Sequence, residues 1–132
     1  MGKVPVVFLV DDDEDYREVN RTVLESAGYR AVCFPCPEDA LREAARNPPD
    51  LIITDMMMGS LDDGLQLSRA LRTDPNLRDV PVLLVTGMVR ELGLDIVPRG
   101  QGDLDALNAS AFLEKPTPPA RLLREVRRLL GE

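Results

Sequence analysis

The chain has 132 residues, of which 44% are hydrophobic, and its 16 Lys and Arg against 23 Asp and Glu give a formal net charge of −7. This length and apolar content fit a globular domain with its own core and exclude a disordered chain. The acidic balance argues against direct nucleic-acid binding, because that affinity comes mainly from Lys and Arg neutralising phosphates. The sequence has no apolar run of membrane-spanning length and no basic-then-apolar leader, so we expect a cytoplasmic protein that contacts no membrane.

The residues available for chemistry are limited by the absence of histidine. That absence removes the commonest zinc ligand and the usual general base, so any reaction must use carboxylates, Lys, Ser, Thr or Cys. The two cysteines, Cys33 and Cys36, form a C-x-x-C pair that no second pair or histidine completes as a zinc site. We interpret them as structural thiols and keep a thiol redox function as the alternative.

Short apolar runs alternate with helical periods along the whole chain. The predicted strands cover residues 4–10, 29–34, 51–54, 80–85 and 111–113. After the first strand, apolar residues recur at spacings of 3, 4 and 4, and these are Tyr16, Val19, Val23 and Ala27. This spacing predicts a helix with one buried face, which Gly28 terminates.

Further helices are predicted from their start signals and apolar stripes. Pro37 suits the first position of the second helix, and Thr117 before Pro118 has the pattern of an N-terminal cap for the last. The expected buried stripes are Leu41, Ala44 and Ala45, then Leu67, Ala70 and Leu71, and finally Leu122, Leu123, Val126, Leu129 and Leu130. Residues 88–94 are predicted as a short helix before an irregular connection, because the stretch is rich in breakers.

Five strands separated by helices predict an α/β domain with a parallel sheet and right-handed crossovers. In such a sheet, functional groups gather at the carboxyl ends of the strands. The residues that fall there are Asp11, Asp12, Asp55, Thr86 and Lys115.

Three carboxylates cannot share a small crevice in ionised form without a counter-charge. A hard divalent cation with oxygen ligands would supply it, and Mg²⁺ suits a site with few carboxylates. Lys115 would add a second positive charge and Thr86 a hydroxyl donor. A carboxylate nucleophile, a metal ion, an ammonium and a hydroxyl are the groups that phosphoryl transfer to an aspartate requires.

The order of these pieces resembles the receiver domains of bacterial two-component response regulators, and the match covers nearly the whole chain. The matching pieces are Val10-Asp11-Asp12, the strand ending in Asp55, Thr86-Gly87, and Phe112 three residues before Lys115-Pro116. The resemblance implies a flavodoxin-like, doubly wound (βα)5 fold with a five-stranded parallel sheet in the order 2-1-3-4-5. We expect a single receiver domain over residues 1–132, with no output domain in this chain.

The resemblance also implies roles for individual residues. Asp55 would be the phosphoacceptor, and Mg²⁺ would be held by Asp11, Asp12, Asp55 and the backbone carbonyl of Met57. Thr86 and Lys115 would hold the phosphoryl oxygens. The switch pair would be Thr86 and Phe112, and the peptide bond before Pro116 would be cis.

The function implied is a signalling switch rather than a turnover enzyme. The partners implied are a histidine kinase or a histidine phosphotransfer protein upstream, and a protein partner or fused output domain downstream. A homodimer is left open, and no direct nucleic-acid contact is expected.

Two departures from the family pattern lie beside the expected site. The loop after Asp55 has Gly59 where the family has Pro, and it carries one extra residue. From Thr86 to Lys115 there are 115 − 86 = 29 positions, several more than is usual, and the excess falls within residues 88–108. We therefore expect an intact phosphorylation site with an unusual output segment.

Two alternatives remain on the sequence alone. One is a degenerate receiver that acts as a constitutive protein-interaction module and shows no Mg²⁺-dependent response. The other is a small phosphohydrolase of the haloacid-dehalogenase type, whose nucleophile motif Asp11-x-Asp13 superficially fits.

Overall fold

The computed structural model describes residues 4–55, 63–86 and 110–132, with the backbone alone for residues 63–66 and 86. In chain order its elements are β1 (Val6–Val10), α1 (Glu14–Ser26), β2 (Arg30–Phe34), α2 (Pro37–Arg46), β3 (Leu51–Asp55), α3 (Asp63–Thr73), β4 (Val82–Thr86), β5 (Ala111–Glu114) and α5 (Pro119–Leu129). The short helix predicted over residues 88–94 lies outside the described residues. Within the described ranges, no helix combines the length and the apolar character needed to cross a membrane.

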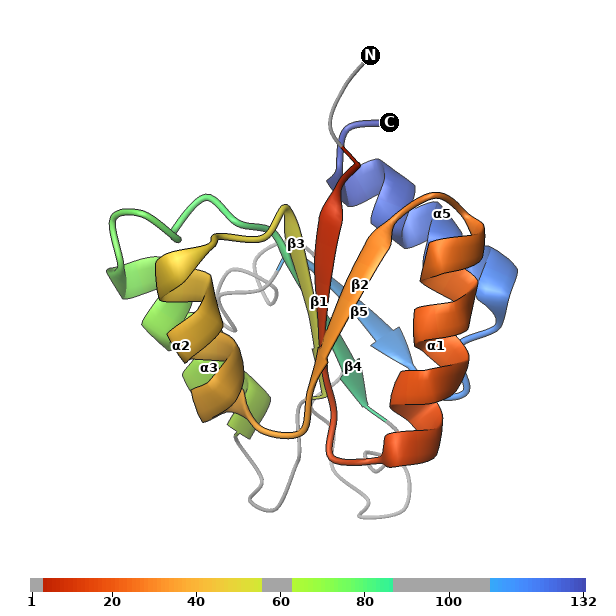
Figure 1. Ribbon diagram of the computed structural model, residues 1–132, viewed down its shortest axis with the longest axis horizontal. Coiled ribbons are helices and arrows are strands. Elements are labelled where there is room, and N and C mark those ends of the chain that lie inside the picture. Colours follow the sequence, from red (N-terminus) through yellow and green to blue (C-terminus); the bar gives the residue numbers. More distant parts are fainter. Residues whose placement is uncertain (1–3, 56–62, 87–109) are drawn as a thin grey trace.

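The strands form one parallel sheet in the order β2-β1-β3-β4-β5, which confirms the predicted topology. Helices α1 and α5 cover one face of the sheet, and α2 and α3 cover the other (Figure 1). Along β1, Val7 and Leu9 pack on the α1 and α5 side, whereas Phe8 and Val10 pack on the α2 and α3 side. Burial on both faces explains why the strands are apolar almost throughout.

The strand register brings the ends of several strands to one edge of the sheet. Val10 is paired with Thr54, and Thr86 is paired with Glu114. The next residues along β1, β3 and β5 therefore reach the same edge, and these are Asp11, Asp55 and Lys115.

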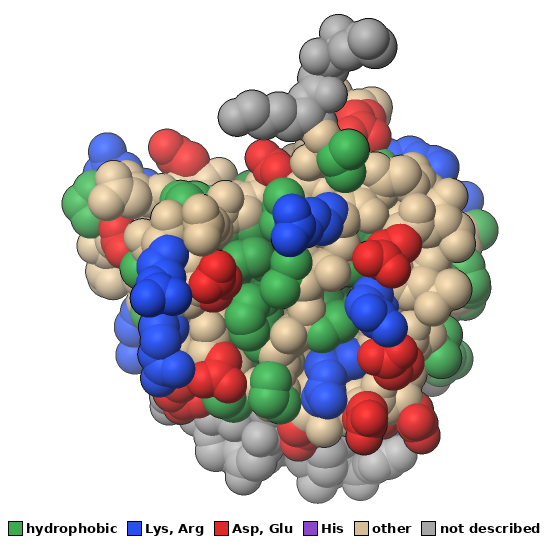
Figure 2. Space-filling model, viewed as in Figure 1, with side chains coloured by type: hydrophobic (Ala, Val, Ile, Leu, Met, Phe, Trp, Pro, Cys, Tyr) green, Lys and Arg blue, Asp and Glu red, His purple; other side chains and the backbone are tan. Residues whose placement is uncertain are grey.

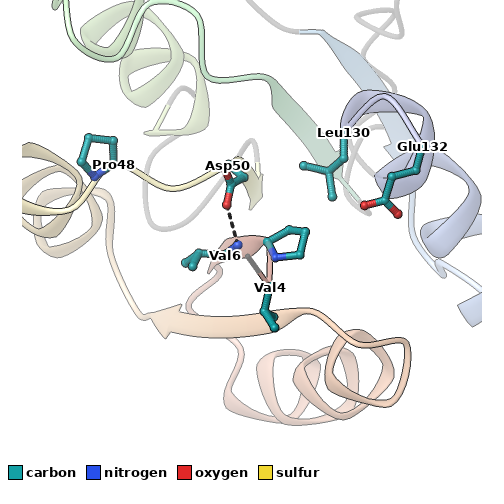
Figure 3. A pocket seen from close by; sticks show the side chains of 7 residues that line it. Val4, Val6, Pro48, Asp50, Leu130 and Glu132 are labelled. Carbon is teal, nitrogen blue, oxygen red and sulfur yellow. Dashed lines mark hydrogen bonds between the residues drawn. The ribbon is translucent and has the colours of Figure 1, made fainter. Parts of the chain in front are cut away.

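At the opposite edge, a hollow of about 600 Å³ lies between the start of β1 and the end of α5 (Figure 3). Its two carboxylates hold chain segments in place. Asp50 Oδ2 accepts the backbone N–H of Val6 at 2.7 Å, and Glu132 Oε1 accepts the Tyr29 hydroxyl at 2.8 Å. β1 begins at Val6, two residues later than predicted.

The buried face of α1 differs from the predicted one. Val19 is 61% exposed, whereas Asn20 and Leu24 are 4% and 0% exposed. Asn20 can lie inside because its Nδ2 donates to the carbonyl oxygen of Tyr16 at 2.8 Å, which satisfies the buried amide. The other predicted members of the face are partly buried, and these are Tyr16, Val23 and Ala27.

The stripe of α2 also begins earlier than predicted. Pro37 lies in the first turn as expected, but the fully buried residues are Ala40 and Ala44, and Ala45 is exposed. Alanines four positions apart lie on one helical face, and their small side chains let the helix approach the sheet closely.

Figure 2 shows charged side chains of both signs over α1 and α2, with hydrophobic ones between them at the edge strand β2.

The start of α5 corrects the predicted cap. Pro118 occupies the N-cap position and no side chain caps the helix, whereas the Thr117 hydroxyl is bonded to that of Tyr16. The predicted apolar stripe is confirmed: Leu122 and Val126 are fully buried, and partly buried beside them lie Leu123, Leu129 and Leu130.

Gly28 ends α1 as predicted. Its φ of +96° lies in the left-handed region that a residue with a side chain rarely adopts.

Candidate functional site

Three carboxylates meet at the carboxyl edge of the sheet, where the sequence predicted them. Asp11 follows β1 and is 1% exposed, Asp55 ends β3 and is 8% exposed, and Asp12 is exposed to solvent. One carboxylate oxygen of each residue lies within 4.8 Å of those of the other two. Among the residues that the structure describes, this is the only cluster of three side chains able to hold a metal ion.

Asp11 is fixed by hydrogen bonds on three sides. The Asp11 backbone N–H donates to the Phe34 carbonyl oxygen at 3.1 Å, and the Asp11 carbonyl oxygen accepts Arg17 Nη1 at 2.6 Å. Its Oδ1 accepts the backbone N–H of Asp13 at 2.9 Å. These bonds hold the acidic turn rigidly and direct Oδ2 toward Lys115.

Asp13 serves the helix rather than the cluster. Its Oδ1 accepts the backbone N–H groups of Asp15 at 2.9 Å and Tyr16 at 3.2 Å, so it is the N-cap of α1. The phosphohydrolase alternative requires the Asp11-x-Asp13 pair to act together. This geometry uses Asp13 for capping, which does not favour that alternative.

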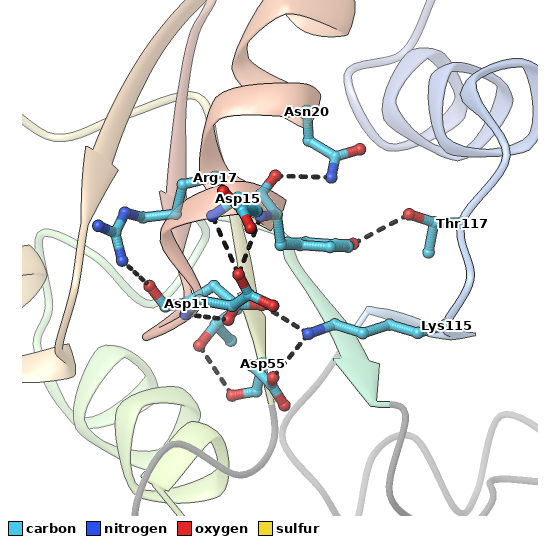
Figure 4. Close-up of polar contacts among 10 residues, drawn as sticks. Asp11, Asp15, Arg17, Asn20, Asp55, Lys115 and Thr117 are labelled. Carbon is cyan, nitrogen blue, oxygen red and sulfur yellow. Dashed lines mark hydrogen bonds and ion pairs between the residues drawn. The ribbon is translucent and has the colours of Figure 1, made fainter.

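Within the described part of the chain, Lys115 is the one residue whose ammonium group contacts carboxylates of the cluster. Figure 4 shows its side chain reaching toward Asp11 and Asp55, and Nζ lies 2.8 Å from Asp11 Oδ2 and 3.0 Å from Asp55 Oδ2. Burial alone would lower the pKa of Lys115, but the hydrogen bonds and charges of the two carboxylates outweigh it and raise that pKa. The ammonium therefore stays charged at neutral pH. The peptide bond to Pro116 is cis, as predicted.

The charge balance of this cluster favours a divalent cation. Among the described residues of the cluster, three carboxylates and one ammonium sum to a formal charge of 1 − 3 = −2. All three candidate ligands are carboxylate oxygens, which suit a hard ion such as Mg²⁺ rather than a soft metal. The residues present therefore fit the predicted magnesium site.

Sequence analysis missed two residues that surround Lys115. Its Nζ lies 4.1 Å from the centroid of the Tyr16 ring, and the Tyr16 hydroxyl shares a 3.0 Å hydrogen bond with Thr117 Oγ1. Burial raises the pKa of the Tyr16 phenol, so the ring is neutral. The available signals were an aromatic residue one turn into the helix after the acids and a hydroxyl two residues after the lysine.

For three other predicted residues, the structure describes only part of the expected arrangement. Thr86 ends β4 at the carboxyl edge, but its side chain lies outside the described part of the chain. Met57 falls within residues 56–62, which are also outside it. Phe112 in β5 is paired with Leu84 and packs, partly buried, against the core on the α2 and α3 side. Its role as a switch stays a prediction.

The two cysteines are not members of the acidic cluster. Cys33 and Cys36 are free thiols near the junction of β2 and α2, and neither joins a group of three potential metal ligands within the described ranges. Burial raises the pKa of the Cys33 thiol and so opposes formation of a reactive thiolate. This favours structural thiols over a redox pair.

Comparison with known sequences gives a consistent result. The family model described as the response regulator receiver domain matches residues 7–127. The C4-dicarboxylate transport transcriptional regulatory protein DctD of Rhizobium meliloti is 33% identical over 128 residues, which are 97% of this chain and 26% of DctD. The polar-differentiation response regulator DivK of Brucella ovis is 26% identical over 126 residues, 96% of either chain. The chain thus spans about a quarter of the first relative and nearly all of the second.

Solved structures share the fold. The chemotaxis response regulator CheY4 of Vibrio cholerae has a TM-score of 0.81 at 26% identity, covering 96% of this chain and 99% of that one. The receiver domain of the sensor histidine kinase PA1611 of Pseudomonas aeruginosa has a TM-score of 0.80 at 26% identity, with coverage of 98% and 100%. The latter structure has a magnesium ion coordinated in its active site cleft.

Proposed function

Because the chain belongs to the response regulator receiver domain family, we propose that Asp55 accepts a phosphoryl group from a histidine kinase or a histidine phosphotransfer protein. The chain is a receiver domain of two-component signalling. The observation that carries the choice of Asp55 is its position. It is the buried carboxylate at the end of β3, it contacts Lys115, and it shares a cluster with Asp11 and Asp12.

Asp11 is less suited to act as the nucleophile. Its Oδ1 accepts the Asp13 backbone N–H and its Oδ2 accepts Lys115, so both oxygens hold the local structure together. Asp11 is also the more buried of the two, at 1% exposed against 8% for Asp55.

In the proposed step, a carboxylate oxygen of Asp55 attacks the phosphorus of a phosphohistidine. An O–P bond forms as the P–N bond breaks, and the departing imidazole takes a proton from water. The Lys115 ammonium and the Thr86 hydroxyl would bind the phosphoryl oxygens and stabilise the charge on them.

The residues proposed to hold Mg²⁺ are Asp11, Asp12 and Asp55 through carboxylate oxygens and Met57 through its backbone carbonyl. When bound, the ion would supply positive charge beside the phosphoryl oxygens and offset the repulsion that the carboxylates exert on a phosphate. The formal charge of −2 on the described residues of the cluster, all of it on carboxylate oxygens, supports this assignment.

The domain phosphorylated on Asp55 would act as a signalling switch rather than as a turnover catalyst. An acyl phosphate on Asp55 would shift a two-state equilibrium, with Thr86 and Phe112 on the paired strands β4 and β5 as the moving pair. The protein would assist only its own phosphorylation and dephosphorylation.

The proposed readout is contact with a downstream protein or with a fused output domain. DctD is described as a transcriptional regulatory protein and is much longer than this chain, whereas DivK is of similar length. We assign residues 1–132 to a single receiver domain and place it in the cytoplasm, where its kinase partner would act.

The experiment that tests the proposal is intact mass measurement after incubation with acetyl phosphate, with Mg²⁺ or with EDTA. We expect one added phosphoryl group on the wild type, dependent on Mg²⁺, and none on Asp55→Asn. Asp50→Asn is the matched control, because Asp50 lies at the opposite edge of the sheet and the one described hydrogen bond of its side chain is to the Val6 N–H. This control should be phosphorylated as fast as the wild type.

Small donors can fail where a kinase succeeds, so beryllofluoride binding is the second measurement. Wild-type protein that takes up neither a phosphoryl group nor beryllofluoride would refute the proposal and support the degenerate-receiver alternative. An adduct that persists in Asp55→Asn would place the acceptor elsewhere.

A further inference from the structure

Lys115 is held by more than its two carboxylates. The face of the Tyr16 ring lies 4.1 Å from Nζ, so the ammonium is enclosed by Asp11, Asp55 and an aromatic ring. A cation over a ring face is attracted to its negative quadrupole, more strongly where water is partly excluded. The lysine side chain is only 22% exposed, so this attraction acts in a partly dry setting.

Tyr16 takes part in two hydrogen bonds, one at the hydroxyl of its ring and one at its backbone carbonyl. Its hydroxyl shares a hydrogen bond with Thr117 Oγ1 at 3.0 Å, which joins α1 to the segment between β5 and α5. At the backbone, the Tyr16 carbonyl oxygen accepts Asn20 Nδ2 at 2.8 Å. Asn20 is buried and cannot turn away to solvent without losing that bond. The ring therefore lies beside Lys115 with its hydroxyl end hydrogen-bonded to Thr117.

We propose that Tyr16 is a positioning residue for Lys115, holding its ammonium at the point between Asp11 and Asp55 where a phosphoryl oxygen would bind. This inference rests on the proposed function. A lysine side chain has four methylene groups and many rotamers, so fixing Nζ in one place needs contacts on several sides.

A neutral ring suits this role better than a third carboxylate. The ring attracts the ammonium without placing another negative charge beside the point where a phosphoryl oxygen would bind. The Tyr16 hydroxyl is engaged with Thr117 rather than directed at the carboxylates, so Tyr16 itself does not contact the reacting atoms.

The first test is the rate of phosphorylation by acetyl phosphate in Mg²⁺. We expect Tyr16→Leu to slow it about fivefold, the effect of losing a partly buried cation–π contact. Tyr16→Phe keeps the ring and should restore a rate within about twofold of the wild type. In a Lys115→Met background, Tyr16→Leu should cause no further loss, because the residue acts through the lysine.

Tyr29→Leu is the matched control for lost packing. Tyr29 packs in the same core on the α1 and α5 side but lies far from the cluster, bonded to Glu132. Its replacement should leave the phosphorylation rate unchanged. An equal loss of rate in Tyr29→Leu, or in Tyr16→Leu within the Lys115→Met background, would overturn the proposal.

The second test does not depend on phosphorylation. In the wild type, the ring current of Tyr16 should shift the NMR signals of the Lys115 ε-methylene protons upfield. That shift should persist in Tyr16→Phe and vanish in Tyr16→Leu. A shift unchanged by Tyr16→Leu would overturn the contact itself.

These outcomes separate the two proposals. A wild type that is phosphorylated on Asp55 at a rate that Tyr16→Leu does not change would overturn only the role of Tyr16. A wild type that takes up neither a phosphoryl group nor beryllofluoride would overturn the proposed function, and the role of Tyr16 with it.

Discussion

Arg17 in α1 donates a hydrogen bond from Nη1 to the backbone carbonyl oxygen of Asp11, 2.6 Å away. The bond joins the first turns of the helix to the turn that carries Asp11 and Asp12. On the other side, the Asp11 N–H donates to the carbonyl oxygen of Phe34 in β2. A bond from a guanidinium is charge-assisted and stronger than a neutral one. Arg17 therefore fixes the backbone from which two of the candidate metal ligands project.

The first prediction concerns this bond. Arg17→Met should weaken Mg²⁺ binding about tenfold, because the carboxylates of Asp11 and Asp12 lose the support that orients them. Isothermal titration with Mg²⁺ measures the affinity. Arg21→Met is the control, since Arg21 lies one turn further along α1 in an exposed ion pair with Glu18. Equal Mg²⁺ affinity in the two variants would contradict the prediction.

The second prediction is a reversal of stability with Mg²⁺. In EDTA, Asp12→Asn should stabilise the protein by about 1 kcal/mol, because it removes one of three like charges at an exposed position. In millimolar Mg²⁺ the wild type should become the more stable protein, because the ion stabilises the folded state that binds it. Urea unfolding in the two buffers measures both differences. An Asp12→Asn protein that is less stable than the wild type in EDTA would refute the crowding of charges on which the metal assignment depends.

The third prediction separates capping from catalysis at Asp13. Asp13→Ala should cost about 1 kcal/mol of stability, because two backbone N–H groups of α1 lose their acceptor. Asp13→Ser keeps a capping oxygen and should recover most of this stability. Both variants should still be phosphorylated by acetyl phosphate in Mg²⁺. If Asp13→Ser folded normally yet lost phosphorylation, the acid would belong to the reacting site, as the phosphohydrolase alternative requires.

The fourth prediction concerns pH and the partly buried thiol of Cys33. Because burial holds the pKa of Cys33 above its ordinary value, the folded state keeps the thiol proton more tightly than the unfolded state. The resulting stability is fully present below the unfolded pKa and is lost as pH rises through the folded pKa. Wild type should therefore lose more stability than Cys33→Ala as the pH is raised through that window, measured by urea unfolding.

The rate of alkylation measures independently how far the fold protects the Cys33 thiol. In a Cys36→Ala background, native Cys33 should react with iodoacetamide more slowly than the urea-unfolded chain at the same pH. Reaction at the same rate in the folded and unfolded protein would show that burial does not protect Cys33.

The position of the candidate site could be predicted from sequence because it depends on strand ends. A buried parallel strand is visible as an apolar run, and the residue that follows it reaches the carboxyl edge whatever the details of packing. Asp11, Asp55 and Lys115 follow this rule, and the structure brings them together.

Contacts that depend on the rotation of a helix or on distant segments could not be predicted in this way. Tyr16 and Thr117 are 101 positions apart, and nothing in either local pattern indicates that they meet. The cap pattern at Thr117 was misleading because its hydroxyl is used by Tyr16 instead. For α1, apolar spacing favoured Val19 over Asn20, since the pattern does not reveal that Asn20 finds a carbonyl partner within its own helix.

The last prediction tests which face of α1 is buried, by making the same substitution at two valines. Val19→Ala should change the free energy of unfolding by less than about 0.5 kcal/mol, because the side chain is 61% exposed. Val23→Ala should cost about 1–2 kcal/mol, because Val23 is partly buried against the core on the α1 and α5 side. Alanine has the higher helix propensity at both positions, so propensity shifts both values equally and cancels in the comparison. Urea unfolding measures both, and a loss at Val19 as large as that at Val23 would restore the face that the spacing predicted, which included both residues.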